Sequence, residues 1–261
     1  MQAWLVTAIV GFSLACNSKP TEQASARSAE PAAPKAANSR THRADLLRRL
    51  DDALRKAAPN IAARLRPGAT DSQIAAFETY LGYPVPEALR DLYRWHDGVE
   101  TVAGGRYDPP DLFFGYWMMS LDELQKTHAR KTTMWKDGTY AKTDRGGAGW
   151  WDEHWIPFLE QIQGGTICVD TAGWSTGHIG QVLEEWHDDS LRELVYRDLD
   201  AWLETFVTAL ETGVLHKMSD GEAIGAGDKI GYEGPGFERW VAYHAKHNPG
   251  YPIRLRAEGG H

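Results

Sequence analysis

The chain has 261 residues, of which 42% are hydrophobic and 11% aromatic, so it can form one sizeable core, and its length permits one domain or two small ones. Its formal net charge is -8, and residues 67–261 carry 31 acidic against 17 basic side chains, a net charge of -14. This acidic part disfavours nucleic acid as a partner and favours a basic protein, although solubility alone also explains such a charge.

The N-terminus has the pattern of a lipoprotein signal sequence. Residues 3–15 form a mainly apolar run, too short for a membrane-spanning helix but suited to a signal-peptide core. The run ends at Ala15-Cys16, although Ser13 stands where Leu is usual and no Lys or Arg precedes the run. We therefore expect a signal peptide over residues 1–15 and a lipid anchor on Cys16 at a bacterial cell envelope. The alternative is a buried or disordered N-terminal segment of a cytoplasmic protein.

The segment after Cys16 cannot form a core. Residues 17–39 contain no large apolar side chain and are rich in Ala, Pro and Ser, so residues 16–41 are expected to form a flexible tether. Lipid on Cys16 would leave Cys168 as the remaining cysteine, without a partner for an intrachain disulfide. Because Cys168 lies inside an apolar segment, a buried and inert thiol is expected there.

The folded region opens with a predicted packing helix. Leu46, Leu50 and Leu54 lie on one helical stripe, and Pro59 interferes with its continuation. The stripe therefore predicts a helix that begins after the tether, at about residue 42, and buries its leucines in the core.

Two short capped helices are predicted next. Thr70 and Gln73 have the spacing of a capping box, and Gly82 can end the helix in a left-handed conformation. Pro86 fits the first turn of a second helix, whose apolar face ends at Asp97-Gly98. The connection is short and extended, so the two helices are expected to pack as a hairpin.

The rest of the folded region predicts a buried strand, a helix, an antiparallel meander and a covering helix. The meander is indicated by three apolar segments with a Gly-Gly turn between the first two, and the covering helix by an apolar stripe. The predicted ranges are 112–120 for the strand, 121–131 for the helix, 156–163, 166–170 and 177–186 for the meander, and 198–211 for the last helix.

Several short motifs follow one another along the chain: His96-Asp97-Gly98, Trp155-Ile156-Pro157-Phe158, Gly164-Gly165, the strand over 166–170, and Gly180-Gln181-Val182. In this order and spacing they resemble the SUKH superfamily, which includes the fungal Smi/Knr-type cell-wall regulators and bacterial immunity proteins that neutralise secreted toxins. The resemblance implies a single α+β domain over residues 42–215, mainly an antiparallel sheet packed by helices. Residues 216–261 would be an appendage packed on this domain. The resemblance says much less about activity.

A Trp-rich segment interrupts the regular pattern. Residues 135–155 combine four Trp with many Gly and Asp, which predicts a mobile loop over the sheet. Exposed indoles there could grip a partner or stack on a sugar ring, or they could fold inward and pack the core; the sequence favours neither. The candidate partner-binding residues are Trp95, His96, Asp97, Trp150, Trp151, Trp155 and Asp170.

A few local clusters of polar side chains could form a metal or catalytic site. His187 and its acidic neighbours could bind a metal, but a solvated acidic turn is the simpler explanation. Glu153 and Asp170 would suit a glycosidase only if they flank one bond. Residues 145–149 are Gly-rich but lack the Lys-Ser/Thr ending of a phosphate-binding loop. We therefore assign no catalytic residue, no metal and no cofactor.

The leading hypothesis is a non-enzymatic immunity-type protein that occludes a basic toxin, or a similar protein partner, at the bacterial envelope. The alternative is a cell-wall assembly regulator or glycan-binding envelope lipoprotein. Export favours this alternative, because many related immunity proteins neutralise cytosolic nucleases. An uncharacterised hydrolase ranks third, and no nucleic-acid partner is expected.

Overall fold

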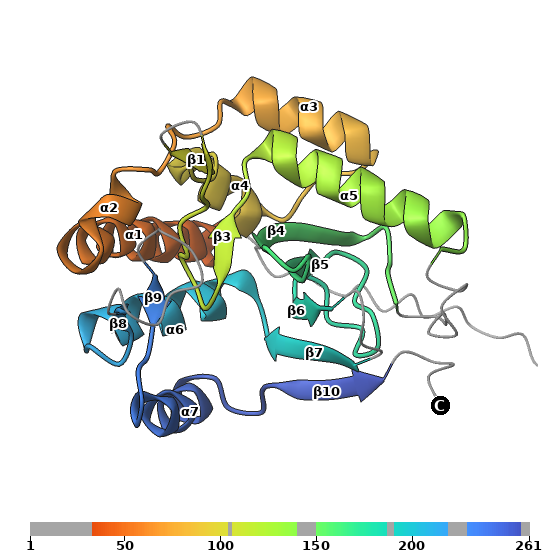
Figure 1. Ribbon diagram of the computed structural model, residues 1–261. Coiled ribbons are helices and arrows are strands. Elements are labelled where there is room, and N and C mark those ends of the chain that lie inside the picture. The colour runs from red at the N-terminus through yellow and green to blue at the C-terminus, as the bar shows by residue number, and fades with distance from the viewer. Residues whose placement is uncertain (1–32, 104–105, 140–149, 187–190, 219–228, 257–261) are drawn as a thin grey trace, which may run out of the picture.

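A computed structural model describes residues 33–103, 106–139, 150–186, 191–218 and 229–256. The predicted signal peptide, Cys16, the Gly-rich run over 145–149 and the acidic turn at His187 lie outside the described residues. Figure 1 shows the arrangement: a central sheet with helices along one side and above one end. The helices are α1 (Ala33–Ala57), α2 (Pro59–Ala62), α3 (Asp71–Leu81), α4 (Glu87–Trp95), α5 (Leu121–Lys136), α6 (Leu199–Glu211) and α7 (Gly236–His247).

The central sheet has six strands in the order β10-β7-β6-β5-β4-β3, and every neighbouring pair is antiparallel. Helices and an antiparallel sheet therefore form an α+β fold, as predicted. Two small hairpins, β1–β2 and β8–β9, lie outside this sheet. The strands are β1 (Val102–Ala103), β2 (Arg106–Tyr107), β3 (Tyr116–Met118), β4 (Trp155–Gln161), β5 (Thr166–Asp170), β6 (Val182–Glu185), β7 (Leu191–Tyr196), β8 (His216–Lys217), β9 (Ile230–Gly231) and β10 (Ile253–Arg256).

The ends of α3 are fixed by the residues predicted to fix them. The Thr70 hydroxyl accepts a hydrogen bond from the Gln73 backbone N–H, and the Gln73 side chain accepts one from the Thr70 backbone N–H. Gly82 ends the helix with φ of 82°, in the left-handed region. A second capping box, which was not predicted, forms between Ser120 and Glu123 at the start of α5. This helix runs to Lys136, five residues beyond the predicted end.

Two elements differ from the sequence-based expectation at the borders of the domain. Helix α1 begins at Ala33 and so includes the last nine residues of the predicted tether; alanine favours a helix even without an apolar face. Residues 253–256 form β10, an edge strand paired with β7, and α7 packs beside α6. The C-terminal segment therefore contributes to the central sheet and is more than an appendage.

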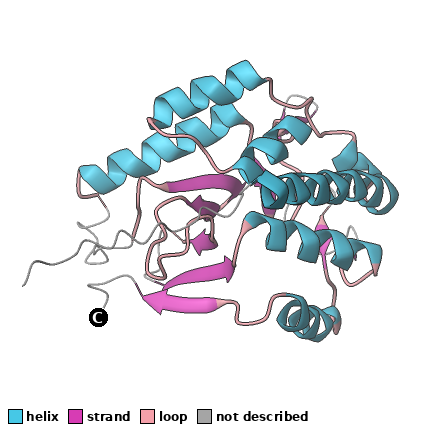
Figure 2. Cartoon of the chain, turned by 180° about the vertical axis from the view of Figure 1, so that it is seen from behind, coloured by secondary structure: helices cyan, strands magenta, loops and turns pink. Residues whose placement is uncertain are grey.

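The sheet is buried on both faces. On one face α1, α4 and α6 pack in a layer that Figure 2 shows from behind, and Leu46, Leu50 and Leu54 of α1 are fully buried there, as predicted. On the other face a second cluster forms around Trp150, Trp151, Trp155, Cys168, Leu183 and Leu194. Neighbouring residues of β5 alternate between the two clusters, so this strand has no solvent-facing side.

Candidate functional site

The His96-Asp97-Gly98 turn follows α4 and is hydrogen-bonded to the start of α5. Asp97 is buried, and its Oδ1 accepts a 2.8 Å hydrogen bond from the Leu121 backbone N–H at the start of α5. Gly98 has φ of 75°, and a Cβ there would come within 2.4 Å of the Ser120 backbone nitrogen. Asp97 and Gly98 therefore have a structural role, and Asp97 offers little surface to a partner.

Trp95 and His96 are only partly buried at this turn. The His96 ring lies edge-on to the Trp95 indole, with ring centroids 4.4 Å apart. Its Nδ1 bonds the Arg66 carbonyl oxygen, and its Nε2 lies 3.6 Å from Oδ1 of Asp51 on α1. These contacts hold the His96 ring in place beside the tryptophan.

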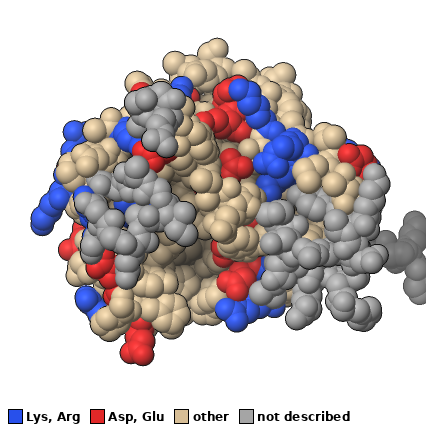
Figure 3. Space-filling model, in the orientation of Figure 1, with Lys and Arg blue, Asp and Glu red and all other residues tan. Residues whose placement is uncertain are grey.

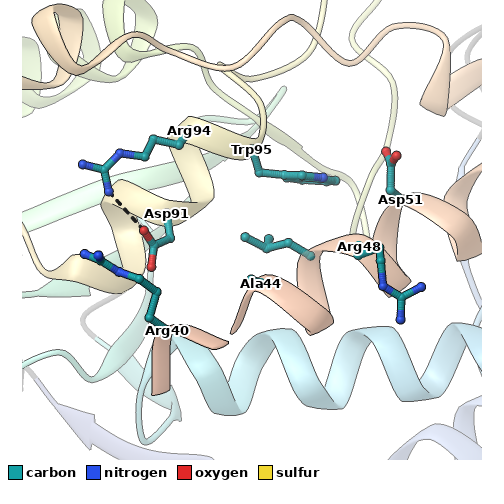
Figure 4. Close-up of a pocket in the computed structure, with 8 residues that line it drawn as sticks. Arg40, Ala44, Arg48, Asp51, Asp91, Arg94 and Trp95 are labelled. Carbon is teal, nitrogen blue, oxygen red and sulfur yellow. Dashed lines mark hydrogen bonds and ion pairs between the residues drawn. The ribbon is translucent and has the colours of Figure 1, made fainter. Parts of the chain in front are cut away.

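A groove of about 460 Å³ lies between α1 and α4 next to this turn. Figure 4 shows the Trp95 indole extending over α1, with Ala44 below it and Arg94 on the same helix pointing away from the ring. Arginine side chains from both helices surround the apolar floor. The lining residues are Arg40, Ala44, Leu47, Arg48, Asp51, Asp91, Arg94 and Trp95.

The arginines around this groove, which we call the α1–α4 groove, are held by carboxylates. Arg94 pairs with Asp91 at 3.1 Å and with Asp71 at 2.9 Å, and Arg40 pairs with Glu87. Arg48 bonds Asp45 and Asp52 on its own helix. Paired guanidinium groups beside an accessible indole are typical of protein-contact surfaces, where Trp and Arg are enriched.

Beneath the groove a buried arginine joins three helices. Arg43 of α1 is only 5% exposed and bonds both carboxylate oxygens of Asp200 on α6, at 2.6 and 2.8 Å. It also bonds Asp91 of α4 at 2.6 Å. The bidentate contact ties α1 to α6, and the bond to Asp91 ties α1 to α4 beneath the groove.

The three tryptophans of the predicted loop lie in the core. Trp150 and Trp151 are 1% exposed and Trp155 is fully buried, so the inward-folded alternative is the one that the structure adopts. The Trp151 indole N–H donates to the Thr132 hydroxyl at 3.0 Å, and Trp155 packs edge-on against Trp174. The indoles cover the second face of the sheet because its apolar side chains would otherwise face water. They cannot serve as partner contacts in this conformation.

A buried ionic cluster lies under the tryptophans and was missed in the sequence. Lys131 of α5 and Glu185 of β6 are both buried, and Nζ lies 2.6 Å from Oε2. Thr166 also donates to this Glu185 oxygen at 2.9 Å. Arg192 of β7 contacts the Trp150 carbonyl oxygen at 2.7 Å and lies 3.9 Å from Oε1 of Glu185. Lys131 follows Leu124 by seven residues, a spacing that marks the buried face of α5.

Asp170 is used within its own loop. Its two carboxylate oxygens accept hydrogen bonds from the backbone N–H groups of residues 172, 173 and 174 and from the Gln181 amide, at 2.5 to 3.0 Å. The side chain is fully buried. Asp170 therefore orders the β5–β6 connection and is not available to a partner.

The other polar residues near the tryptophans make separate contacts and do not form one site. Glu153 is half-exposed and pairs with Lys136 at 2.5 Å, so it does not share the buried environment of Asp170. His154 bonds Asp152 at 2.8 Å near the surface. Burial raises the pKa of the Cys168 thiol to about 12, which agrees with an inert core cysteine. Glu153 and Asp170 are thus engaged in separate contacts and do not form the carboxylate pair of a glycosidase.

Comparison with protein families identifies the fold. The model of the SMI1 / KNR4 family (SUKH-1) matches residues 68–205, slightly more than half of the chain. The chain belongs to this family. Members of the SUKH family are generally non-enzymatic immunity proteins or regulators and typically bind protein partners, so a non-catalytic binding module is supported at that level. Comparison with curated proteins gave no match.

Within the described ranges, no three His, Cys, Asp or Glu side chains gather as a metal site. No helix in the described part of the chain has the length and apolar character needed to cross a membrane.

The buried ionic cluster generates a stability prediction. Replacing Lys131 by Met leaves the buried Glu185 carboxylate without its closest cation, so the free energy of unfolding should fall by roughly 3 kcal/mol. Lys126→Met, which removes an exposed pair with Asp122 on the same helix, should change it little. Urea denaturation of both variants checks this. Equal small effects would show that water reaches the cluster.

Proposed function

We propose that this protein is a non-catalytic, immunity-type binding protein that occludes a basic protein partner through the α1–α4 groove. One observation carries the proposal: in a SUKH-1 chain, the partly buried Trp95 lines a groove with an apolar floor among ordered arginines. Such a surface provides an aromatic anchor and preorganised hydrogen-bond donors, which together supply most of the binding energy in protein interfaces.

The charge of the chain supports a basic partner. The net charge of -14 over residues 67–261 attracts a positive surface from a distance and accelerates the encounter. The groove arginines are already paired with carboxylates, so they add little repulsion. Charge thus steers the partner, while Trp95 and the apolar floor provide the contact.

The N-terminal pattern supports a location at the bacterial envelope. Lipid on Cys16, followed by the Pro- and Ala-rich segment, would hold the domain at a membrane surface while leaving the groove free. A toxin that acts in the periplasm fits this location better than a cytosolic nuclease.

The structure removes the main support for the alternative of a glycan-binding lipoprotein. Sugar stacking was expected from Trp150 and Trp151, and both indoles are buried. A role in cell-wall assembly, as suggested by the SMI1 / KNR4 family, would require a protein partner and is compatible with the same groove.

The groove is tested by placing a charged side chain on its floor. Ala44 is exposed, so Ala44→Glu should leave the fold intact while blocking access to Trp95. Affinity purification from the native host should recover a basic partner with the unmodified protein, with recovery falling as salt increases. Ala44→Glu should reduce recovery about tenfold or more, or about 1.4 kcal/mol, because the longer side chain occupies the groove floor and keeps a partner away from the Trp95 indole.

The matched control is Ala76→Glu, the same change at an exposed position of α3 outside the groove. It should bind as the unmodified protein does. Equal recovery with both variants, or a partner that is acidic or insensitive to salt, would contradict the proposal.

The membrane anchor has its own test. Growth with a radiolabelled fatty acid should label the full-length protein, and Cys16→Ala should abolish labelling while Cys168→Ala leaves it unchanged. The thioether-linked lipid requires the Cys16 sulfur, whereas Cys168 is buried. A protein that carries no label would contradict the lipid anchor on Cys16.

A further inference from the structure

A second hollow lies between α7 and the central sheet. Its volume is about 670 Å³, and Figure 3 shows it as a recess near the middle of the face turned to the viewer, with mostly uncharged atoms and acidic side chains close by. We call it the α7 cavity. Aromatic side chains dominate its wall, among them Phe114, Tyr116, Trp186, Tyr232, Phe237 and Trp240.

The Glu184 carboxylate lies in this cavity. Oε1 of Glu184 accepts hydrogen bonds from the Tyr116 hydroxyl at 2.5 Å and from the Trp186 indole N–H at 3.2 Å. Among the described residues, no Lys or Arg forms an ion pair with Glu184. Burial raises the pKa of this carboxyl group, and the charge of Glu193 raises it further.

Glu193 doubles the negative charge at the same place. It lies directly opposite Glu184 in the β6–β7 ladder, a position that brings the side chains of cross-strand partners together on one face. Arg254 of β10 pairs with Glu193 at 2.7 Å, but its side chain is 69% exposed. Burial lowers the pKa of His244, which also lines the cavity, so this ring contributes no charge near neutral pH. The charged groups named here sum to a net charge of -1.

One residue of the aromatic wall has an unusual backbone conformation. Phe114 has φ of 51°, in the left-handed region that is costly for a bulky residue. This conformation places the Phe114 ring 4.9 Å from Trp240 and 5.3 Å from Tyr232, measured between centroids. On α7 itself, Phe237 is 54% exposed at the cavity, so an apolar surface faces solvent there.

One wall of the cavity lies outside the matched family region. The family model ends at residue 205, whereas Tyr232, Phe237, Trp240 and Arg254 follow it. The segment that was predicted to be an appendage therefore forms one wall of the cavity. The carboxylates of Glu184 and Glu193 come from strands inside the matched region.

We propose that the α7 cavity binds an arginine side chain presented by a basic segment of the partner protein. This inference rests on the proposed function and names the chemistry of a second contact. A guanidinium group stacks on aromatic faces, is less strongly hydrated than an ammonium group, and can bond two neighbouring carboxylates in one plane. Its entry would supply a cation to Glu184, which has none among the described residues, and so offset the cost of burying that carboxylate.

The test uses a synthetic peptide with two arginines spaced by glycines, and the same peptide with citrulline in place of arginine. Citrulline keeps the shape and removes the charge. Titration calorimetry with the full-length protein should detect the arginine peptide, with the citrulline peptide bound about tenfold more weakly or worse. Glu184→Gln, which keeps acceptors for Tyr116 and Trp186, should weaken the arginine peptide by a similar factor without lowering the unfolding midpoint.

The matched control is Glu238→Gln, an exposed change on α7 outside the cavity lining that alters the net charge equally. It should leave the affinity unchanged. Equal affinity for both peptides, or equal loss in both variants, would overturn the assignment. A third outcome would also overturn the assignment: a higher affinity for the arginine peptide in the full chain that carries Lys19→Gln and Arg27→Gln. It would mean that the chain's own N-terminal segment occupies the cavity.

Failure of this assignment can be separated from failure of the proposed function. If Glu184→Gln recovers the partner from the host as well as the unmodified protein while Ala44→Glu does not, the α1–α4 groove stands and the α7 cavity assignment is wrong. If no basic partner is recovered with any variant, the proposed function itself fails.

Discussion

Burial of the central sheet on both faces is the constraint from which the rest of this structure follows. Every residue of β5 is buried, so the polar side chains of this strand must find partners inside the protein. Thr166 bonds Glu185, and Asp170 bonds the backbone of its own loop. Glu185 in turn requires the buried Lys131 of α5. A sheet with one solvent-facing side would need none of these contacts.

The second buried face decides how the Trp-rich segment is used. Trp150, Trp151 and Trp155 close this face, so their apolar surface stabilises the fold and cannot bind a partner. Recognition is left to surfaces beside the helices. The α1–α4 groove carries Trp95 between ordered arginines, and the α7 cavity carries Glu184 between aromatic rings. Both are framed partly by elements outside the family match, and these elements give the common fold its own surfaces.

Local signals in the sequence predicted local structure well. The capping box at Thr70 and the glycine at residue 82 fix α3 because their hydrogen bonds involve residues only a few positions away. Features that depend on distant segments were not predictable. Strand β7 was missed because Arg192 and Glu193 interrupt its apolar pattern, although Arg192 is fully buried beside Glu185. The candidate partner-binding residues were predicted least well. Whether an indole faces solvent or the core depends on how the second face of the sheet is covered, and this depends on distant segments.

The burial of the Trp-rich segment is tested most directly by hydroxyl-radical footprinting of the full-length protein, read by mass spectrometry. Trp135, which is 38% exposed on α5, serves as the internal reference. The account predicts that Trp150, Trp151 and Trp155 are oxidised much more slowly than Trp135, at rates close to that of buried Trp202. Oxidation of the three tryptophans as fast as Trp135 would show that they form an exposed loop and would contradict the two-faced core.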